Sequence, residues 1–149
     1  MPPSPVHGLP PPSPLPSSPS GAALAGRRVL LVDDCEDALE SLAMLLELCG
    51  ARVTSASNGL HALQRLDDDG LPDVLISDIT MPGLDGYRLV EALRGRPGGA
   101  SPVAVALSGL ARPQDDERAR QAGFDQLVCK PALVEDIEGA VEAVLRRRG

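Results

Sequence analysis

From Arg27 onward, short apolar runs alternate with longer stretches that carry a helical repeat of apolar residues. The runs predict strands at 29–32, 52–55, 73–77, 103–107 and 126–129. The stretches between them predict helices at 36–48, 58–68, 85–94, 113–122 and 133–147. Five strands that alternate with five helices favour an α/β fold with a parallel sheet covered on both faces. The strands lack the polar alternation of a half-exposed sheet, which agrees with burial on both faces.

The first part of the chain has a different composition. Nine of the first nineteen residues are proline, and residues 1–26 contain no Asp, Glu, Lys or Arg. Such a segment cannot bury enough apolar surface to offset the entropy of ordering it. We therefore expect residues 1–26 to be a disordered Pro-rich tail or linker. The remaining part, residues 27–149, is long enough for one domain.

Charge and cysteine content restrict the classes of partner and the compartment. The net charge of −7 disfavours a surface for nucleic acid or an anionic membrane. Three cysteines without a C-x-x-C pair are typical of free thiols in a reducing compartment. No apolar stretch approaches the ~20 residues needed to cross a bilayer, and no signal peptide is evident. These features predict a cytoplasmic protein.

Polar side chains stand where four of the five predicted strands end. Asp33 and Asp34 follow the first strand, Asp78 follows the third, Ser108 the fourth and Lys130 the fifth. The carboxyl ends of parallel strands meet at one edge, where α/β proteins bind ligands. Three carboxylates there need a compensating cation, and an oxygen-rich acidic cluster suits Mg²⁺.

Simpler interpretations exist for some of these residues. Asp34 could be a helix N-cap, and Ser108 before a glycine could be an ordinary turn residue. Lys130 is the single lysine beside thirteen arginines. A lone lysine in such a chain indicates a place where a compact ammonium is needed rather than a planar guanidinium, although chance is an alternative.

Four segments together carry a family resemblance. VLLVDDCEDALESLAMLLE, LISDITMPGLDGYRLVEALR, VAVALSG and AGFDQLVCKP resemble, in this order, the receiver domain of two-component response regulators. These motifs are most similar to those of receiver domains attached to hybrid histidine kinases. The resemblance covers residues 27–148 and implies a flavodoxin-like, doubly wound five-stranded sheet with strand order 2-1-3-4-5 and five helices.

The resemblance also implies roles for the residues at the strand ends. Asp78 would accept a phosphoryl group from a phosphohistidine. Asp34 and Asp78 would bind Mg²⁺ directly, with the backbone carbonyl of Thr80 as a further ligand and Asp33 acting through water. Such a protein catalyses its own phosphorylation and dephosphorylation, and no separate output enzyme domain is expected.

Two further residues would complete the site. Ser108 and Lys130 would contact phosphoryl oxygens, an electrostatic arrangement that phosphoryl transfer requires. The Lys130–Pro131 peptide bond is expected to be cis. Two residues depart from the family pattern: Leu127 stands where a signalling aromatic is usual, and Cys35 replaces a common Asn. The usual aromatic switch is therefore in doubt.

The resemblance implies a histidine kinase or histidine phosphotransfer protein as partner, and signalling by protein–protein contact without nucleic acid or membrane. A homodimer is a further possible assembly. The first helix has more leucines than one buried face requires, so we hypothesise that part of it docks the helical bundle that carries the phosphohistidine; the residues are Leu42, Leu45, Leu46 and Leu48.

Three alternatives remain beside this interpretation. The domain could be a degenerate receiver that serves as a scaffold or dimerisation module. It could also be the terminal receiver fragment of a hybrid histidine kinase, with the Pro-rich segment as the former linker. An enzyme of the haloacid-dehalogenase type is disfavoured, because its second carboxylate two residues after the nucleophile is here Thr80.

Overall fold

The computed structural model describes residues 23–109 and 112–148. Its strands are β1 (Arg28–Val32), β2 (Arg52–Ala56), β3 (Val74–Asp78), β4 (Val103–Ser108) and β5 (Gln126–Cys129). Its helices are α2 (Glu36–Leu48), α3 (Gly59–Asp69), α4 (Gly86–Arg94), α5 (Pro113–Ala122) and α6 (Val134–Arg148). Each predicted element is present, with bounds that differ by at most one residue at either end.

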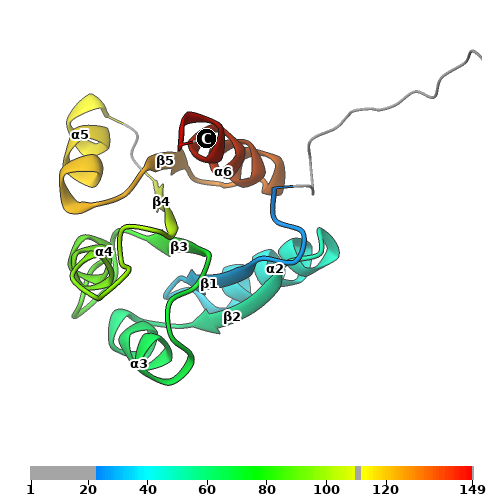
Figure 1. Cartoon of the computed structure of the whole chain (residues 1–149), viewed down its shortest axis with the longest axis horizontal. Coiled ribbons are helices and arrows are strands. Elements are labelled where there is room, and N and C mark those ends of the chain that lie inside the picture. The colour runs from blue at the N-terminus through cyan, green and yellow to red at the C-terminus, as the bar shows by residue number, and fades with distance from the viewer. Residues whose placement is uncertain (1–22, 110–111, 149) are drawn as a thin grey trace, which may run out of the picture.

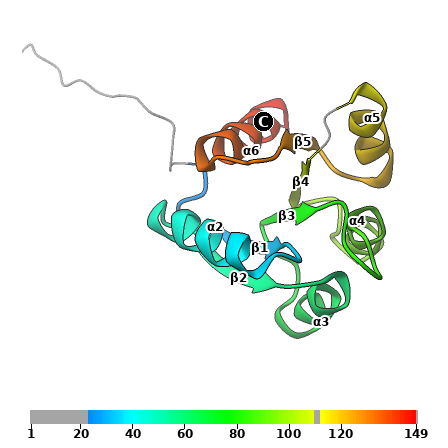
Figure 2. The ribbon, with the colours of Figure 1, turned by 180° about the vertical axis from the view of Figure 1, so that it is seen from behind.

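The five strands form one parallel sheet in the order β2-β1-β3-β4-β5. Helices α2 and α6 cover one face, and α3, α4 and α5 cover the other (Figures 1 and 2). This is the flavodoxin-like, doubly wound arrangement that the family resemblance implied. The order reverses between β1 and β3, so the switch point lies at the carboxyl ends of these two strands.

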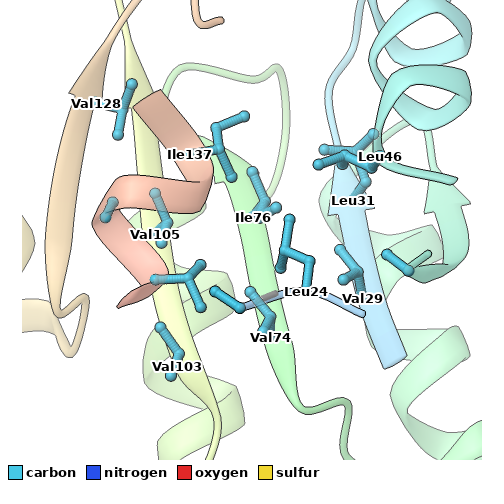
Figure 3. Close-up of a cluster of buried hydrophobic side chains, with 14 of the residues drawn as sticks. Leu24, Val29, Leu31, Leu46, Val74, Ile76, Val103, Val105, Val128 and Ile137 are labelled. Carbon is cyan, nitrogen blue, oxygen red and sulfur yellow. The ribbon is translucent and has the colours of Figure 1, made fainter. Parts of the chain in front are cut away.

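Alternate residues of each strand point to opposite faces and enter two separate apolar clusters. On the α2 and α6 face, strand valines and leucines pack against Leu46 and Ile137 (Figure 3). On the other face, Leu75 and Ala106 pack against residues of α3, α4 and α5. Phe124 is buried in this second cluster, as a core residue should be. Burial on both faces holds the strand ends in fixed positions.

The packed part of the chain begins earlier than the sequence predicted. Residues 23–26 were expected in the Pro-rich tail, but Ala23 and Leu24 are buried, and Leu24 lies in the α2 and α6 cluster (Figure 3). The backbone N–H of Gly26 donates to the carbonyl oxygen of Gly50 at 2.9 Å. Apolar burial and this hydrogen bond fix the segment ahead of β1. The rest of the predicted tail, residues 1–22, lies outside the described residues.

Within the described ranges, no helix is long and apolar enough to span a membrane.

Candidate functional site

Three charged side chains from three strand ends meet at the carboxyl edge of the sheet. Asp33 follows β1 directly, Asp78 is the last residue of β3, and Lys130 follows β5 directly. The Lys130 Nζ atom lies 3.2 Å from Asp78 Oδ2 and 3.4 Å from Asp33 Oδ2. One ammonium therefore bridges two carboxylates that belong to neighbouring strands at the switch point.

Asp34 completes an acidic cluster with Asp33 and Asp78. Among the described residues, these three carboxylates form a group in which one oxygen of each lies within 4.8 Å of the others. Asp33 and Asp78 are buried, with 3% and 5% of their surface exposed, whereas Asp34 is exposed to solvent. An all-oxygen donor set that opens to water on one side fits Mg²⁺, which retains several waters and takes few protein ligands.

The charges of the site shift each other's ionisation. Burial is the largest cause that raises the pKa of Asp78; Lys130 opposes this shift, and Asp33 and Asp34 add to it. Burial lowers the pKa of Lys130, but the carboxylates of Asp78 and Asp33 outweigh it, and the net shift is upward. The ammonium is therefore charged at neutral pH. The cluster still carries more negative than positive charge, which a divalent cation would offset.

Backbone hydrogen bonds hold Asp33 in place. The backbone N–H of Cys35 donates to Asp33 Oδ1 at 2.9 Å. The backbone N–H of Asp33 donates to the carbonyl oxygen of Ala56 at 3.2 Å. Cys35 is the N-cap residue of α2, with no side-chain cap bond, so the interpretation of Asp34 as the cap is wrong. The Asp34 carboxylate instead belongs to the acidic cluster.

Lys130 is aimed at the cluster by the loop between β5 and α6. Its backbone N–H donates to the carbonyl oxygen of Ser108 at 2.7 Å, which ties this loop to the end of β4. The Lys130–Pro131 peptide bond is cis, as predicted. Ser108 itself is half-buried at the end of β4 and pairs in register with Cys129. Its strand end thus lies at the same edge as Asp78.

Thr80 and Leu127 were also singled out in the sequence. Thr80 is exposed and lies two residues after Asp78, in the connection between β3 and α4. Its backbone carbonyl as a metal ligand stays a prediction. Leu127 is half-buried and packs against the apolar cluster of α3, α4 and α5. The residue that replaces the usual aromatic is thus part of the packing on that face.

A groove beside the site was not predicted. It has a volume of about 500 Å³ and opens between α2 and the β5–α6 loop. Asp33 and Lys130 form its polar end, and the rest of its wall is largely apolar, including Leu42, Leu45 and Pro131. The excess of leucines in α2 predicted one wall of this groove in part. The other wall, formed by the β5–α6 loop, could not be predicted, because it depends on how the chain turns after β5.

Comparison with known proteins gives a consistent assignment. The family profile of the response regulator receiver domain matches residues 29–142. An uncharacterized 14.6 kDa protein of Leptolyngbya boryana is 40% identical over 72% of this chain and 82% of its own length. The transcriptional regulatory protein PrrA of Mycobacterium tuberculosis is 41% identical over 82% of this chain, which spans about half of PrrA, 51%.

Solved structures agree with these sequence matches. The signal receiver domain of a signal transduction histidine kinase from Syntrophus aciditrophicus superposes with a TM-score of 0.70 at 30% identity. The match covers 81% of this chain and 91% of that domain.

Proposed function

This chain belongs to the response regulator receiver family and is a phosphorelay receiver, and from this we propose that Asp78 is its phosphoryl acceptor. The observation that carries the proposal is the position of the carboxylate. Asp78 ends a buried strand, belongs to the acidic cluster and contacts the only lysine of the chain at 3.2 Å. A carboxylate kept in such surroundings at an energetic cost is typical of a functional site.

The acidic cluster is our candidate for a Mg²⁺ site. Asp34 and Asp78 would bind the ion directly, Asp33 through water, and the Thr80 carbonyl would add a backbone oxygen. Bound Mg²⁺ would supply positive charge that neutralises phosphoryl oxygens and keeps the acceptor ionised. The donor set of the cluster supports this assignment, because hard oxygen ligands with one solvent-facing side suit the ion.

The protein's own residues then have simple tasks. The Asp78 carboxylate attacks the phosphorus atom, the bond to the donor's nitrogen breaks, and the phosphoryl group ends on the aspartate oxygen. The ammonium of Lys130 would stabilise negative charge on one oxygen of the transferred group, and the Ser108 hydroxyl would donate to another of its oxygens. Because phosphoryl transfer needs positioning and charge neutralisation more than covalent help, this short set of residues suffices.

The acceptor is tested with a small phosphodonor. Radiolabelled acetyl phosphate with Mg²⁺ should label the wild-type protein, and Asp78→Asn should abolish this label while the circular dichroism spectrum stays unchanged. Asp68→Asn removes an exposed carboxylate at the end of α3 and is the matched control, which should label like the wild type. Equal labelling of Asp78→Asn and wild type would refute the assignment.

We further propose that the groove beside the site receives the helical protein that carries the phosphohistidine. Receiver domains exchange phosphate with histidine kinases or phosphotransfer proteins, and such a partner must bring an imidazole to Asp78. The apolar wall of α2 leads directly to Asp33 and Lys130. Leu45 lies on this wall and is 47% exposed. Exposed apolar side chains that line a groove are typical of a surface that binds another protein.

Leu45→Arg should slow transfer from a phosphohistidine donor at least about tenfold, the cost of one lost interface anchor, and leave acetyl phosphate labelling unchanged. Leu60→Arg is the control, because Leu60 is 69% exposed on α3, across the sheet from α2. Equal slowing of phosphorylation with both donors, or equal slowing in both variants, would count against this docking site.

The three free cysteines support a reducing, cytoplasmic setting for this exchange.

A further inference from the structure

The α5 helix has the weakest apolar anchorage of the five helices. Across Pro113–Ala122, only Ala119 is fully buried, and the sequence PQDDERARQA contains no Leu, Ile, Val, Phe or Met. The other four helices each bury at least one leucine or isoleucine. Since anchorage depends on the apolar area removed from water, α5 is the helix that a modest change of contacts can displace.

One side-chain contact of α5 stands out against this background. The guanidinium of Arg118 lies 4.1 Å from the centroid of the Tyr87 ring on α4, a cation–π arrangement. The Tyr87 ring is buried, with 9% of the residue exposed. A polar groove of about 220 Å³ separates the two helices at this level, and both residues line it. Arg118 therefore reaches across a gap that apolar packing does not fill.

Gly86, the residue before Tyr87, contacts the backbone of Asp78 and Ile79. The backbone N–H of Gly86 donates to the carbonyl oxygen of Ile79 at 2.8 Å. A Cβ atom on Gly86 would collide with the backbone oxygen of Asp78 and with Ile79 Cα, so the first turn of α4 rests directly on the acceptor's backbone. A shift of Asp78 and Ile79 is thus transmitted to the residue that carries the ring, since close-packed backbone does not yield.

We propose that the Tyr87–Arg118 contact is the latch by which the state of Asp78 controls the position of α5. The proposal rests on the proposed function of Asp78 and concerns the regulation that follows phosphorylation. The chain has two aromatic residues, and β5 offers Leu127 instead of a ring. Phe124 is buried in the core, so Tyr87 is the aromatic residue that meets a charged side chain of α5. Displacement of its ring removes this cation–π contact from a weakly anchored helix.

The test measures hydrogen exchange of residues 113–122 with and without beryllofluoride and Mg²⁺, a stable mimic of the phosphorylated aspartate. In the wild type, beryllofluoride should change exchange in α5 by at least about twofold. Arg118→Gln should speed α5 exchange in the free protein roughly two- to fivefold, the value of one exposed cation–π contact. Beryllofluoride should then produce no further change in this variant.

A matched control lies on the same helix. Arg120→Gln removes the same charge, but Arg120 pairs with Asp116 within α5. It should keep the wild-type response to beryllofluoride. A persistent response in Arg118→Gln, an equal loss in Arg120→Gln, or no α5 response in the wild type would overturn the latch. Labelling of Asp78 by acetyl phosphate, measured in parallel, should be unchanged in both variants; a wild type that takes no label would overturn the acceptor assignment and the latch together.

Variants of the ring give a second readout. Tyr87→Phe keeps the aromatic face and should keep the response of α5, whereas Tyr87→Leu keeps much of the apolar volume and should lose it. Because the chain has one tyrosine and no tryptophan, its intrinsic emission reports Tyr87 alone. Wild-type emission should change on addition of beryllofluoride, and it should change less in Arg118→Gln. Equal behaviour of Tyr87→Phe and Tyr87→Leu in the exchange experiment would contradict a role for the ring.

Discussion

Replacement of Lys130 by methionine isolates the charge balance of the site. Methionine keeps a chain of similar length but removes the ammonium that contacts Asp33 and Asp78. Both carboxylates are buried, whereas 31% of the lysine side chain is exposed. The variant therefore leaves two buried negative charges without their shared cation, and we expect the folded state to be destabilised.

The contact distances give the magnitude. A pair of unit charges at 3.2 Å interacts with about 5 kcal/mol at an effective dielectric constant of about 20. Breaking a buried ion pair costs about 3–5 kcal/mol, and partial exposure of the ammonium puts this pair at the lower end of that range. Loss of Lys130 should therefore lower the free energy of unfolding by about 3 kcal/mol in metal-free buffer at pH 7.

The direction of the pH dependence follows from the pKa shifts. The pKa of Asp78 is already raised above 3.8, and loss of the ammonium raises it further. A group whose pKa is higher in the folded state favours folding more as pH falls through that value. The stability gap between Lys130→Met and wild type should therefore narrow as pH is lowered from 7 toward 5. Millimolar Mg²⁺ should narrow it too, because an ion in the proposed site would offset the negative charge that the variant leaves uncompensated.

Urea denaturation followed by circular dichroism measures this gap. The double variant Lys130→Met/Asp78→Asn should be more stable than Lys130→Met alone, by about 1–2 kcal/mol, since one of the uncompensated charges is gone. A gap below about 0.5 kcal/mol that does not depend on pH or Mg²⁺ would refute the electrostatic account of the site.

Three further predictions concern other parts of the molecule. Leu24→Ala should cost about 2–4 kcal/mol in urea denaturation, because the side chain is fully buried ahead of β1; a loss below 1 kcal/mol would place this segment outside the core. At pH 8, iodoacetamide should modify Cys35 and Cys129 before Cys49. Burial and a hydrogen bond to Glu138 raise the pKa of the Cys49 thiol and so lower its reactivity. Tryptic mapping gives the order of modification, and a first reaction at Cys49 would contradict the prediction. Mg²⁺ at about 100 times its Kd should stabilise the fold by about 2.7 kcal/mol in calorimetry, and Asp34→Asn should weaken this effect; an unchanged Mg²⁺ response would exclude Asp34 as a ligand.

The strand ends were predictable because their signal is local. A buried parallel strand is a short apolar run, and a charged residue directly after it must lie at the sheet's carboxyl edge. Asp33, Asp78 and Lys130 all follow this rule, and the contacts of 3.2 and 3.4 Å agree with it. The resemblance to a family added the strand order and the cis bond before Pro131, which periodicity alone does not provide.

Other features depend on packing between distant segments. Leu24 sits beside a Pro-rich region and belongs to no periodic pattern, so its burial follows only from the space between α2 and α6. The contact of Arg118 with Tyr87 joins two helices whose sequences show no complementary pattern. The cap of α2 was ambiguous because Asp34 and Cys35 are adjacent, and only the backbone geometry distinguishes them.

The two edges of the sheet use different cations for different purposes. At the edge opposite the site, the guanidinium of Arg94 donates to three backbone carbonyls and to the carboxylate of Asp125 at 3.0 Å. Its planar fork satisfies several fixed acceptors at once, which suits a permanent structural connection. At the carboxyl edge, the ammonium of Lys130 contacts two carboxylates and lies partly open to solvent. A compact charge on a flexible stem can follow an incoming phosphoryl oxygen without breaking a fixed set of bonds. In the proposed function, the single lysine of the chain thus stands where a cation would exchange a carboxylate for a phosphoryl oxygen, and Arg94 stands where the bonds are permanent.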